Sequence, residues 1–276
     1  MKLKALFLVS GLTLIIAVLL NTLNAAEAAA PPALDPARNQ RILQATIQIA
    51  LYEYDEGQGI EVGGRGLGTL VRHNGQTLIV THDHWTHLNT NLREAEFRNA
   101  RGDLLLTVPA NTLLNLIRYR DGGTMILAAP AELAAMAPVA LDPAVASAGQ
   151  VAWVARRARH DGGNSVEVVA AHVETVEAEA GLPRLRLRGA GGAVVIPGDS
   201  GGGIWYDGQL QGNLWSGGVE IRTTWLDRLL GTSRQTETSL IYSALLPHGE
   251  ITAIADGNGN SQSLATATAV QNLPEG

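Results

Sequence analysis

The chain has no cysteine among its 276 residues, and only 4 % of them are aromatic. It can therefore form no disulfide bond and must depend on a hydrophobic core for its stability. With 46 % hydrophobic residues it can fill one large core or two small ones, mainly with aliphatic side chains. Its only lysines are Lys2 and Lys4, and the net charge is −6. An acidic chain without a basic run is a poor candidate for binding nucleic acid.

The N-terminus carries the one long apolar run of the sequence. Two lysines precede the apolar stretch from Ala5 to Leu20, and small residues follow it, as in a secretory signal peptide. We expect residues 1–28 to be removed and the rest to be exported, either secreted or periplasmic. Cleavage after Ala28 removes two of the 20 basic and one of the 26 acidic residues, leaving 18 and 25 and a net charge of −7. The alternative is a membrane anchor through residues 5–20, and contact with a membrane is expected only if this segment is retained.

The remainder of the sequence has the pattern of an all-β protein. Short apolar runs are separated by turn signals, many of them among the 31 glycines. Apolar residues alternate at Ile47, Ile49 and Leu51, and Asn74-Gly75 between two apolar runs predicts a hairpin. The strands fall into two halves separated by an Ala/Pro-rich crossover, which suggests two packed β-barrels. A single large sandwich is the alternative that this pattern leaves open.

The pattern also gives approximate domain limits. A Pro-rich linker with a short helix follows the signal, the two β-rich halves come next, and the end is polar and small. We therefore predict a signal peptide or anchor at 1–28, a linker and short helix at 29–41, an N-terminal barrel at 42–135, a C-terminal barrel at 136–250 and a disordered tail at 251–276.

The stretch 198–205, GDSGGGIW, surrounds Ser200 with glycine. Such a stretch is either a surface turn or a nucleophile whose neighbours expose backbone N–H groups. A serine nucleophile requires a base, and histidine has the most suitable pKa near neutrality. His84 is a candidate because it follows an apolar strand directly, in LIVTHDHW.

These two motifs together resemble those of trypsin-like (chymotrypsin-fold) serine proteases, in a bacterial-type form without cysteines. GRGLGTLV and LIVTHDHW resemble the stretch around the family's histidine, and GDSGGGIW with GNLWSGG resembles the stretch around its serine. The order His, Asp, Ser is also that of the family, and the resemblance covers roughly residues 45–245. It implies an all-β fold of two packed six-stranded antiparallel β-barrels with the active-site cleft between them. It also implies an exported serine endopeptidase that acts on a polypeptide substrate and needs no cofactor.

The resemblance implies a role for each matching residue. His84 fills the fourth position of the tetrad 81–84 that corresponds to the family's catalytic histidine, and Ser200 matches the nucleophile. The backbone N–H groups of Gly198 and Ser200 would form the oxyanion hole.

The acidic member of the triad is harder to place. The family's aspartate opens an apolar strand, and here a gapless fit puts Thr124 at its position. A two-glycine extension puts Asp121 there instead, and we predict Asp121 because a threonine cannot stabilise an imidazolium by charge. Asp83 is a poor candidate for a different reason: it is the neighbour of His84, and neighbouring side chains of an extended segment point in opposite directions.

The substrate-selecting residues are predicted only by analogy with the family. Val194 matches the position that is often acidic in trypsin-type specificity, and Trp215, Ser216 and Gly217 match the strand that pairs with the substrate backbone. The absence of charge near Val194 predicts a small or apolar P1 residue, not Arg or Lys. Glu is not expected either, because Leu214 stands where glutamyl-specific relatives have a histidine.

Three alternatives accompany this interpretation. His82, His84 and His87 could bind zinc, although no distant fourth ligand is evident and we predict no metal site. The chain could be an inactive trypsin-fold binding module, because fold alone does not prove activity. It could also use the same triad chemistry on an ester.

Overall fold

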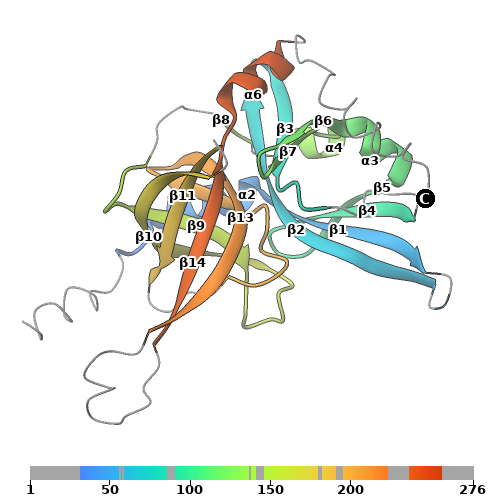
Figure 1. Ribbon diagram of the computed structural model, residues 1–276. Helices are drawn as coiled ribbons and strands as arrows, with labels where there is room; N and C mark the ends of the chain where they lie inside the picture. The colour runs from blue at the N-terminus through green and yellow to red at the C-terminus, as the bar shows by residue number, and fades with distance from the viewer. Residues whose placement is uncertain are drawn as a thin grey trace, which may run out of the picture. The chain divides into compact units, whose positions relative to one another are not determined.

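β-Strands make up most of the described chain, and the helices are short (Figure 1). The structure is a computed structural model and describes residues 32–55, 57, 59–85, 91–136, 138–140, 146–179, 182–190, 195–222 and 236–256. The first half contains α2 (Pro36–Ala45), β1 (Thr46–Asp55), β2 (Gly59–His73), β3 (Gln76–Thr81), β4 (Leu92–Asn99), β5 (Leu104–Pro109), α3 (Ala110–Leu116), β6 (Ile117–Asp121), β7 (Thr124–Ala128), α4 (Ala131–Ala134) and β8 (Val139–Ala140). The second half contains β9 (Val151–Arg157), β10 (Val166–Glu179), β11 (Leu182–Gly189), β12 (Gly203–Tyr206), β13 (Gln209–Arg222), β14 (Thr236–Leu245) and α6 (His248–Ala255).

The first half folds into an eight-stranded sheet. Seven strands follow the order β5-β4-β1-β2-β3-β7-β6, and β8 pairs in parallel with β2. The predicted alternation in β1 is confirmed, because Ile47, Ile49 and Leu51 are all at most 1 % exposed. The predicted hairpin joins β2 to β3, with Asn74 at φ 46° and Gly75 at φ 79°. A two-residue turn with both φ values positive matches the twist of the paired strands.

The second half folds into a closed barrel of six antiparallel strands, in the order β10-β11-β14-β13-β12-β9. Alternation along β11 follows the barrel wall, because Leu185 and Leu187 are fully buried while Arg186 and Arg188 lie partly exposed and pair with Glu174. The sequence predicts an all-β chain of two packed six-stranded antiparallel barrels. The all-β class and one closed six-stranded barrel are confirmed, and the other half is an eight-stranded sheet. This arrangement is consistent with the trypsin-like double-barrel fold.

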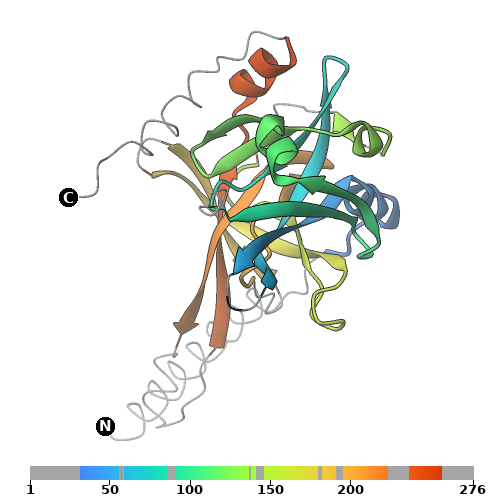
Figure 2. The same cartoon turned by 90° about the vertical axis from the view of Figure 1, so that its right-hand side faces the viewer.

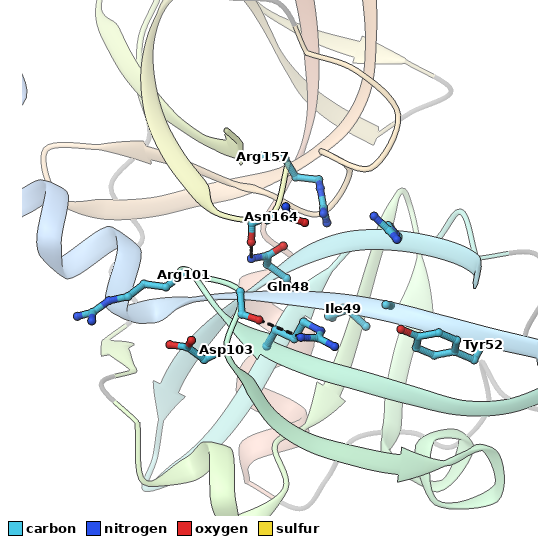
Figure 3. Close-up of a pocket in the computed structure, with 11 residues that line it drawn as sticks. Gln48, Ile49, Tyr52, Arg101, Asp103, Arg157 and Asn164 are labelled. Carbon is cyan, nitrogen blue, oxygen red and sulfur yellow. Dashed lines mark hydrogen bonds between the residues drawn. The ribbon is translucent and has the colours of Figure 1, made fainter. Parts of the chain in front are cut away.

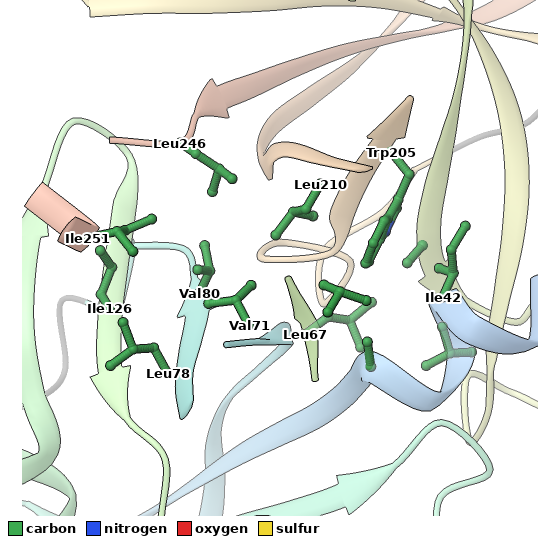
Figure 4. Packing of buried hydrophobic residues seen from close by; sticks show 14 of the residues in the cluster. Ile42, Leu67, Val71, Leu78, Val80, Ile126, Trp205, Leu210, Leu246 and Ile251 are labelled. Carbon is green, nitrogen blue, oxygen red and sulfur yellow. The ribbon is translucent and has the colours of Figure 1, made fainter. Parts of the chain in front are cut away.

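The buried hydrophobic residues form three clusters, and one of them joins the two halves. One fills the first sheet and one fills the barrel. The third lies between them, where Trp205 of β12 packs in the same cluster as Leu67 and Val71 of β2 (Figure 4). A fully buried Trp brings a large apolar surface to this seam, so packing there holds β2 and β12 together.

Helix α6 closes one end of the first sheet (Figures 1 and 2). Its Ile251 and Ile254 belong to the same cluster as Ile126 of β7, and Gln76 Nε2 donates to the Ala255 carbonyl oxygen at 2.9 Å. Residues 251–255, the first part of the tail that was predicted to be disordered, therefore belong to this helix. They are ordered because Ile251 and Ile254, three residues apart, bury one face of the helix against the sheet.

The other predicted limits compare as follows. The expected short helix is α2, which begins at Pro36 and is capped by the Asp35 side chain. The signal or anchor prediction falls on residues 1–28, which lie outside the described ranges. Within those ranges, no helix combines the length and apolarity needed to span a membrane.

Candidate active site

The end of β3 is fixed to β2 by a side-chain hydrogen bond. Thr81 Oγ1 donates to the carbonyl oxygen of Leu67 at 2.6 Å, in a buried position. The chain then leaves the sheet through His82, Asp83 and His84. Strand pairing and this bond together set where the His84 side chain begins.

His82 is a buried, neutral histidine beneath the site. It is 3 % exposed, and burial lowers its pKa to about 3, with positive charge on His84 and Arg120 adding to the effect. Its Nδ1 accepts a hydrogen bond from the His84 backbone N–H at 3.2 Å, so the ring proton resides on Nε2. A Cβ built on Gly66 would lie 2.6 Å from His82 Nε2 and 3.0 Å from the Ser200 carbonyl oxygen. The segments of His84 and Ser200 therefore meet beside Gly66.

The His84 side chain is 39 % exposed and lies beside aromatic rings. Its ring centroid is 5.5 Å from that of Trp215 and 5.4 Å from that of His82. Burial lowers the pKa of His84, the charge of Asp83 opposes this shift, and the charge of Arg184 adds to it. A histidine with a lowered pKa is neutral at pH 7, as a general base must be.

Among the described residues, Asp83 is the carboxylate found beside His84. Its Oδ1 lies 3.8 Å from His84 Nε2, and its Oδ2 accepts the Gly123 N–H at 2.9 Å. The backbone around it is also held, since Arg120 Nη2 donates to the carbonyl oxygens of Asp83 and Trp85, both at 3.1 Å. The sequence argument against Asp83 assumed an extended segment, whereas the chain has already left the strand here.

Asp121 and Thr124 close the hairpin between β6 and β7, and they differ in burial. Asp121 is exposed, and its Oδ1 accepts the N–H of the next residue at 2.7 Å. Thr124 is 1 % exposed, and its Oγ1 donates to Asn213 Oδ1 of the barrel at 2.8 Å. The described residues form no ion pair between Asp121 and His84, so Asp121 as the triad acid stays a prediction.

The Ser200 loop is tied to both halves of the fold. The Ser200 carbonyl oxygen accepts the Leu67 N–H of β2 at 2.8 Å, and the Gly201 N–H donates to the Leu214 carbonyl of β13 at 2.8 Å. Gly201 has φ 85°, and a Cβ there would lie 2.0 Å from the Leu67 carbonyl oxygen. This close approach explains the second glycine of the GDSGGG motif. His84 and the Ser200 hydroxyl share no hydrogen bond within the described chain.

The buried side chain of Asp199 holds the Ser200 loop in place. Its carboxylate is fully buried, accepts the N–H groups of Arg157 and Ile196 at 2.9 and 2.8 Å, and forms an ion pair with Arg159. Three partners compensate the cost of burying the charge. Sequence reasoning missed Arg159, because it lies 40 residues away and no local pattern marks it.

Two N–H groups of the loop 196–202 have no partner among the described residues. Pro197 has no N–H, and those of Ile196, Asp199, Gly201 and Gly202 all donate hydrogen bonds. Those of Gly198 and Ser200 donate to no group in the described chain. Gly198 has φ 95°, a conformation that glycine adopts without strain. Two unpaired donors, one on the serine itself and one two residues before it, are the arrangement that stabilises an oxyanion.

The strand predicted to bind the substrate, residues 215–217, lies next to His84. Trp215 and Ser216 are half-buried, and the guanidinium carbon of Arg184 lies 3.9 Å from the Trp215 ring centroid. Gly217 faces Val195, whose Cγ2 would be 2.4 Å from a Cβ at this position. Val194 lies outside the described residues.

The zinc alternative can be examined only in part. The described ranges contain no group of three or more His, Cys, Asp or Glu side chains that could hold a metal ion. His87 lies outside these ranges.

Comparison with known proteins gave structural matches only. No protein-family model matches the chain, and no curated protein matches it. Among the solved structures that match is an inactive form of Rv3671c from M. tuberculosis H37Rv, a serine-to-alanine mutant, at 16 % identity and a TM-score of 0.47, covering 90 % of this chain and 100 % of that one. A second structure, named Rv3671c protease, inactive form, matches at 16 % identity and a TM-score of 0.46, covering 84 % of this chain and 99 % of that one.

Proposed function

We propose that this protein is an exported serine endopeptidase of the trypsin-like type. The observation that carries the proposal is the pair of unpaired N–H groups at Gly198 and Ser200, in a loop whose other N–H groups are all bonded. A surface turn does not need such donors, because its N–H groups can be paired or solvated without reference to a serine. An acyl-transfer site needs them at the position where negative charge develops.

In the proposed mechanism His84 takes the proton of the Ser200 hydroxyl as the oxygen attacks the scissile carbonyl carbon. The carbonyl oxygen becomes an anion held by the Gly198 and Ser200 N–H groups. His84 then gives the proton to the leaving amine. In the second half His84 takes a proton from water as the water oxygen attacks the acyl carbon, and it returns that proton to Ser200 Oγ as the acid is released. The lowered pKa of His84 supports its role as the base, because the ring is then neutral before the first step.

Two carboxylates are candidates for orienting His84. The strand alignment predicts Asp121, whereas the geometry favours Asp83, which is 3.8 Å from the His84 ring and fixed by the Gly123 N–H. Thr124 is buried at the end of the hairpin and carries no charge that could stabilise a His84 imidazolium. Thr124→Val should therefore slow turnover less than loss of the orienting carboxylate does. That loss costs on the order of 10⁴ in rate in a complete triad.

The proposed P1 residue is small or apolar. Val195 is buried against Gly217, and the guanidinium of Arg184 lies over Trp215, where it would repel an Arg or Lys side chain. Export is proposed from the charged and apolar pattern of residues 1–20.

A second candidate is an inactive trypsin-fold binding module. Thr124, rather than an acid, is the buried residue at the hairpin and bonds Asn213, which favours this alternative. It predicts that Ser200 has no enhanced reactivity.

Labelling with a fluorophosphonate separates the two candidates. The purified exported domain should be labelled at Ser200, as shown by peptide mapping, and Ser200→Ala should lose both labelling and peptide hydrolysis. Ser147→Ala, a change at an exposed serine, serves as the matched control and should retain both. Labelling that persists in Ser200→Ala, or none in the parent protein, would refute the proposal.

A further inference from the structure

Two pockets with several arginines share part of their lining, and one of them lies beside the Ser200 loop. The first has a volume of about 560 Å³ and is lined by Arg65, Arg157 and Arg159 together with Gly198 and small or apolar residues. The second, of about 430 Å³, shares Arg65 and Arg157 with the first (Figure 3). No acidic side chain lines the first pocket within the described residues.

Arg157 is the central residue of this arrangement. Its side chain is only 9 % exposed and extends from the end of β9 toward the first sheet (Figure 3). It lies between two glycines, since a Cβ on Gly163 would be 3.0 Å from its Nε and one on Gly198 would be 3.4 Å from its Cδ. Its guanidinium forms no hydrogen bond or ion pair with a described residue. Burial and the charge of Arg65 lower the pKa of Arg157, and the charges of Asp199 and Asp161 oppose part of this shift.

The charges of the first pocket do not balance. Arg159 is neutralised by its ion pair with Asp199. Arg65 is exposed, and within the described chain it has no hydrogen-bonded or ionic partner. The carboxylates whose charges reach Arg157 are engaged elsewhere, since Asp199 is paired with Arg159 and Asp161 accepts the N–H groups of Gly163 and Asn164. Two positive charges thus face one cavity whose described lining carries no carboxylate. Such a juxtaposition is unfavourable on its own and becomes favourable when an anion binds both groups.

The position of the pocket indicates the source of the anion. Gly198, whose N–H is one of the proposed oxyanion donors, also lines the pocket. Each residue of an extended peptide spans about 3.5 Å, so a substrate with its scissile bond at Ser200 reaches the pocket within a few residues. A carboxylate suits arginine because it accepts two parallel hydrogen bonds from one guanidinium.

We propose that Arg65 and Arg157 form a subsite beside Gly198 that binds a carboxylate of the polypeptide substrate close to the scissile bond. This inference rests on the proposed function, because it assigns the anion to a substrate that Ser200 would cleave. The carboxylate is supplied either by an acidic side chain or by the C-terminus of the substrate.

Binding to the uncleaving Ser200→Ala variant tests the subsite without relying on activity. The probes are fluorescent alanine-based hexapeptides with one Glu, their counterparts with Gln, and versions with a free or an amidated C-terminus. We expect a peptide with a carboxylate at one position to bind at least tenfold more tightly than its neutral counterpart. The Glu/Gln pair and the acid/amide pair show which source supplies it.

Arginine variants complete the test. Arg65→Gln should remove the tenfold preference, Arg157→Lys should reduce it, and Arg118→Gln, at an exposed arginine of β6, should leave it unchanged. Equal affinities for acidic and neutral peptides, or no binding of any probe up to millimolar concentration, would overturn the subsite. If Ser200 is not labelled by a fluorophosphonate and the preference still holds, the proposed function fails and the anion site stands. If Ser200 is labelled and no preference is found, only the subsite fails.

Discussion

The ion pair between Arg159 and Asp199 should control the reactivity of Ser200, because Asp199 is the residue directly before it. The Asp199 carboxylate is fully buried, while the Arg159 side chain is 31 % exposed. Arg159→Gln removes the positive charge and leaves the carboxylate with two backbone N–H donors. The loop should then leave its present conformation in a larger fraction of molecules.

The size of the effect follows from the burial of the two partners. Breaking a fully buried ion pair costs about 3–5 kcal/mol, because one charge is left uncompensated. Two backbone donors remain on Asp199, and water reaches Arg159, so we expect about 2 kcal/mol. If this free energy is lost from the loop alone, the reactive fraction falls about 30-fold.

The assay is the rate at which a fluorophosphonate labels Ser200, measured beside the urea midpoint of unfolding. Arg38→Gln is the control, because its partner Asp207 and Arg38 itself are 70 % and 52 % exposed. An exposed pair contributes at most about 1 kcal/mol, so labelling should be unchanged there.

A double variant makes the test sharper. Asp199→Asn keeps a side chain of the same shape and removes the buried charge, so adding it to Arg159→Gln should recover part of the lost stability. Labelling of Arg159→Gln at the parental rate would refute the reasoning. It would show that the backbone bonds of Asp199 hold the loop without the ion pair.

Two further predictions concern the base and the loop. Asp83→Asn should slow turnover more than Asp121→Asn, and it should move the acidic limb of the pH profile of kcat/KM to lower pH. The direction follows because the charge of Asp83 raises the pKa of His84, so its removal lets the ring stay neutral in more acidic solution; a larger effect of Asp121→Asn would support the strand alignment instead. Gly201→Ala should abolish labelling and lower the melting temperature, because the new Cβ would lie 2.0 Å from the Leu67 carbonyl oxygen of β2. The control is Gly208→Ala, at a glycine with a similar positive φ and open space around it, which should lower the free energy of unfolding by only about 1–3 kcal/mol.

Features encoded by neighbouring residues could be predicted from the sequence. The Asn74-Gly75 turn and the alternation in β1 depend only on adjacent positions, and both are found where expected. The first sheet was expected as a six-stranded barrel, and it has eight strands in an open hydrogen-bonding order. The short β8 is one of the additional strands, and its two residues are too few to show a period.

The electrostatics of the site could not be predicted, because they join residues far apart in the chain. Arg159 and Asp199 are 40 positions apart, and Thr124 and Asn213 are 89 apart. Neither pair has a sequence pattern of its own. The role of Asp83 was missed for a local reason, since period-2 reasoning fails once the chain leaves β3.

Helix α6 has a consequence for the order of events during biosynthesis. It is the last described element, yet its isoleucines cover aliphatic side chains of β3 and β7 in the first half (Figure 4). The N-terminal sheet therefore keeps an uncovered apolar surface until residues 251–255 have emerged. If the chain is exported as proposed, this surface would be covered only once residues 251–255 have also crossed the membrane, so the proposed protease would gain its activity outside the compartment that made it.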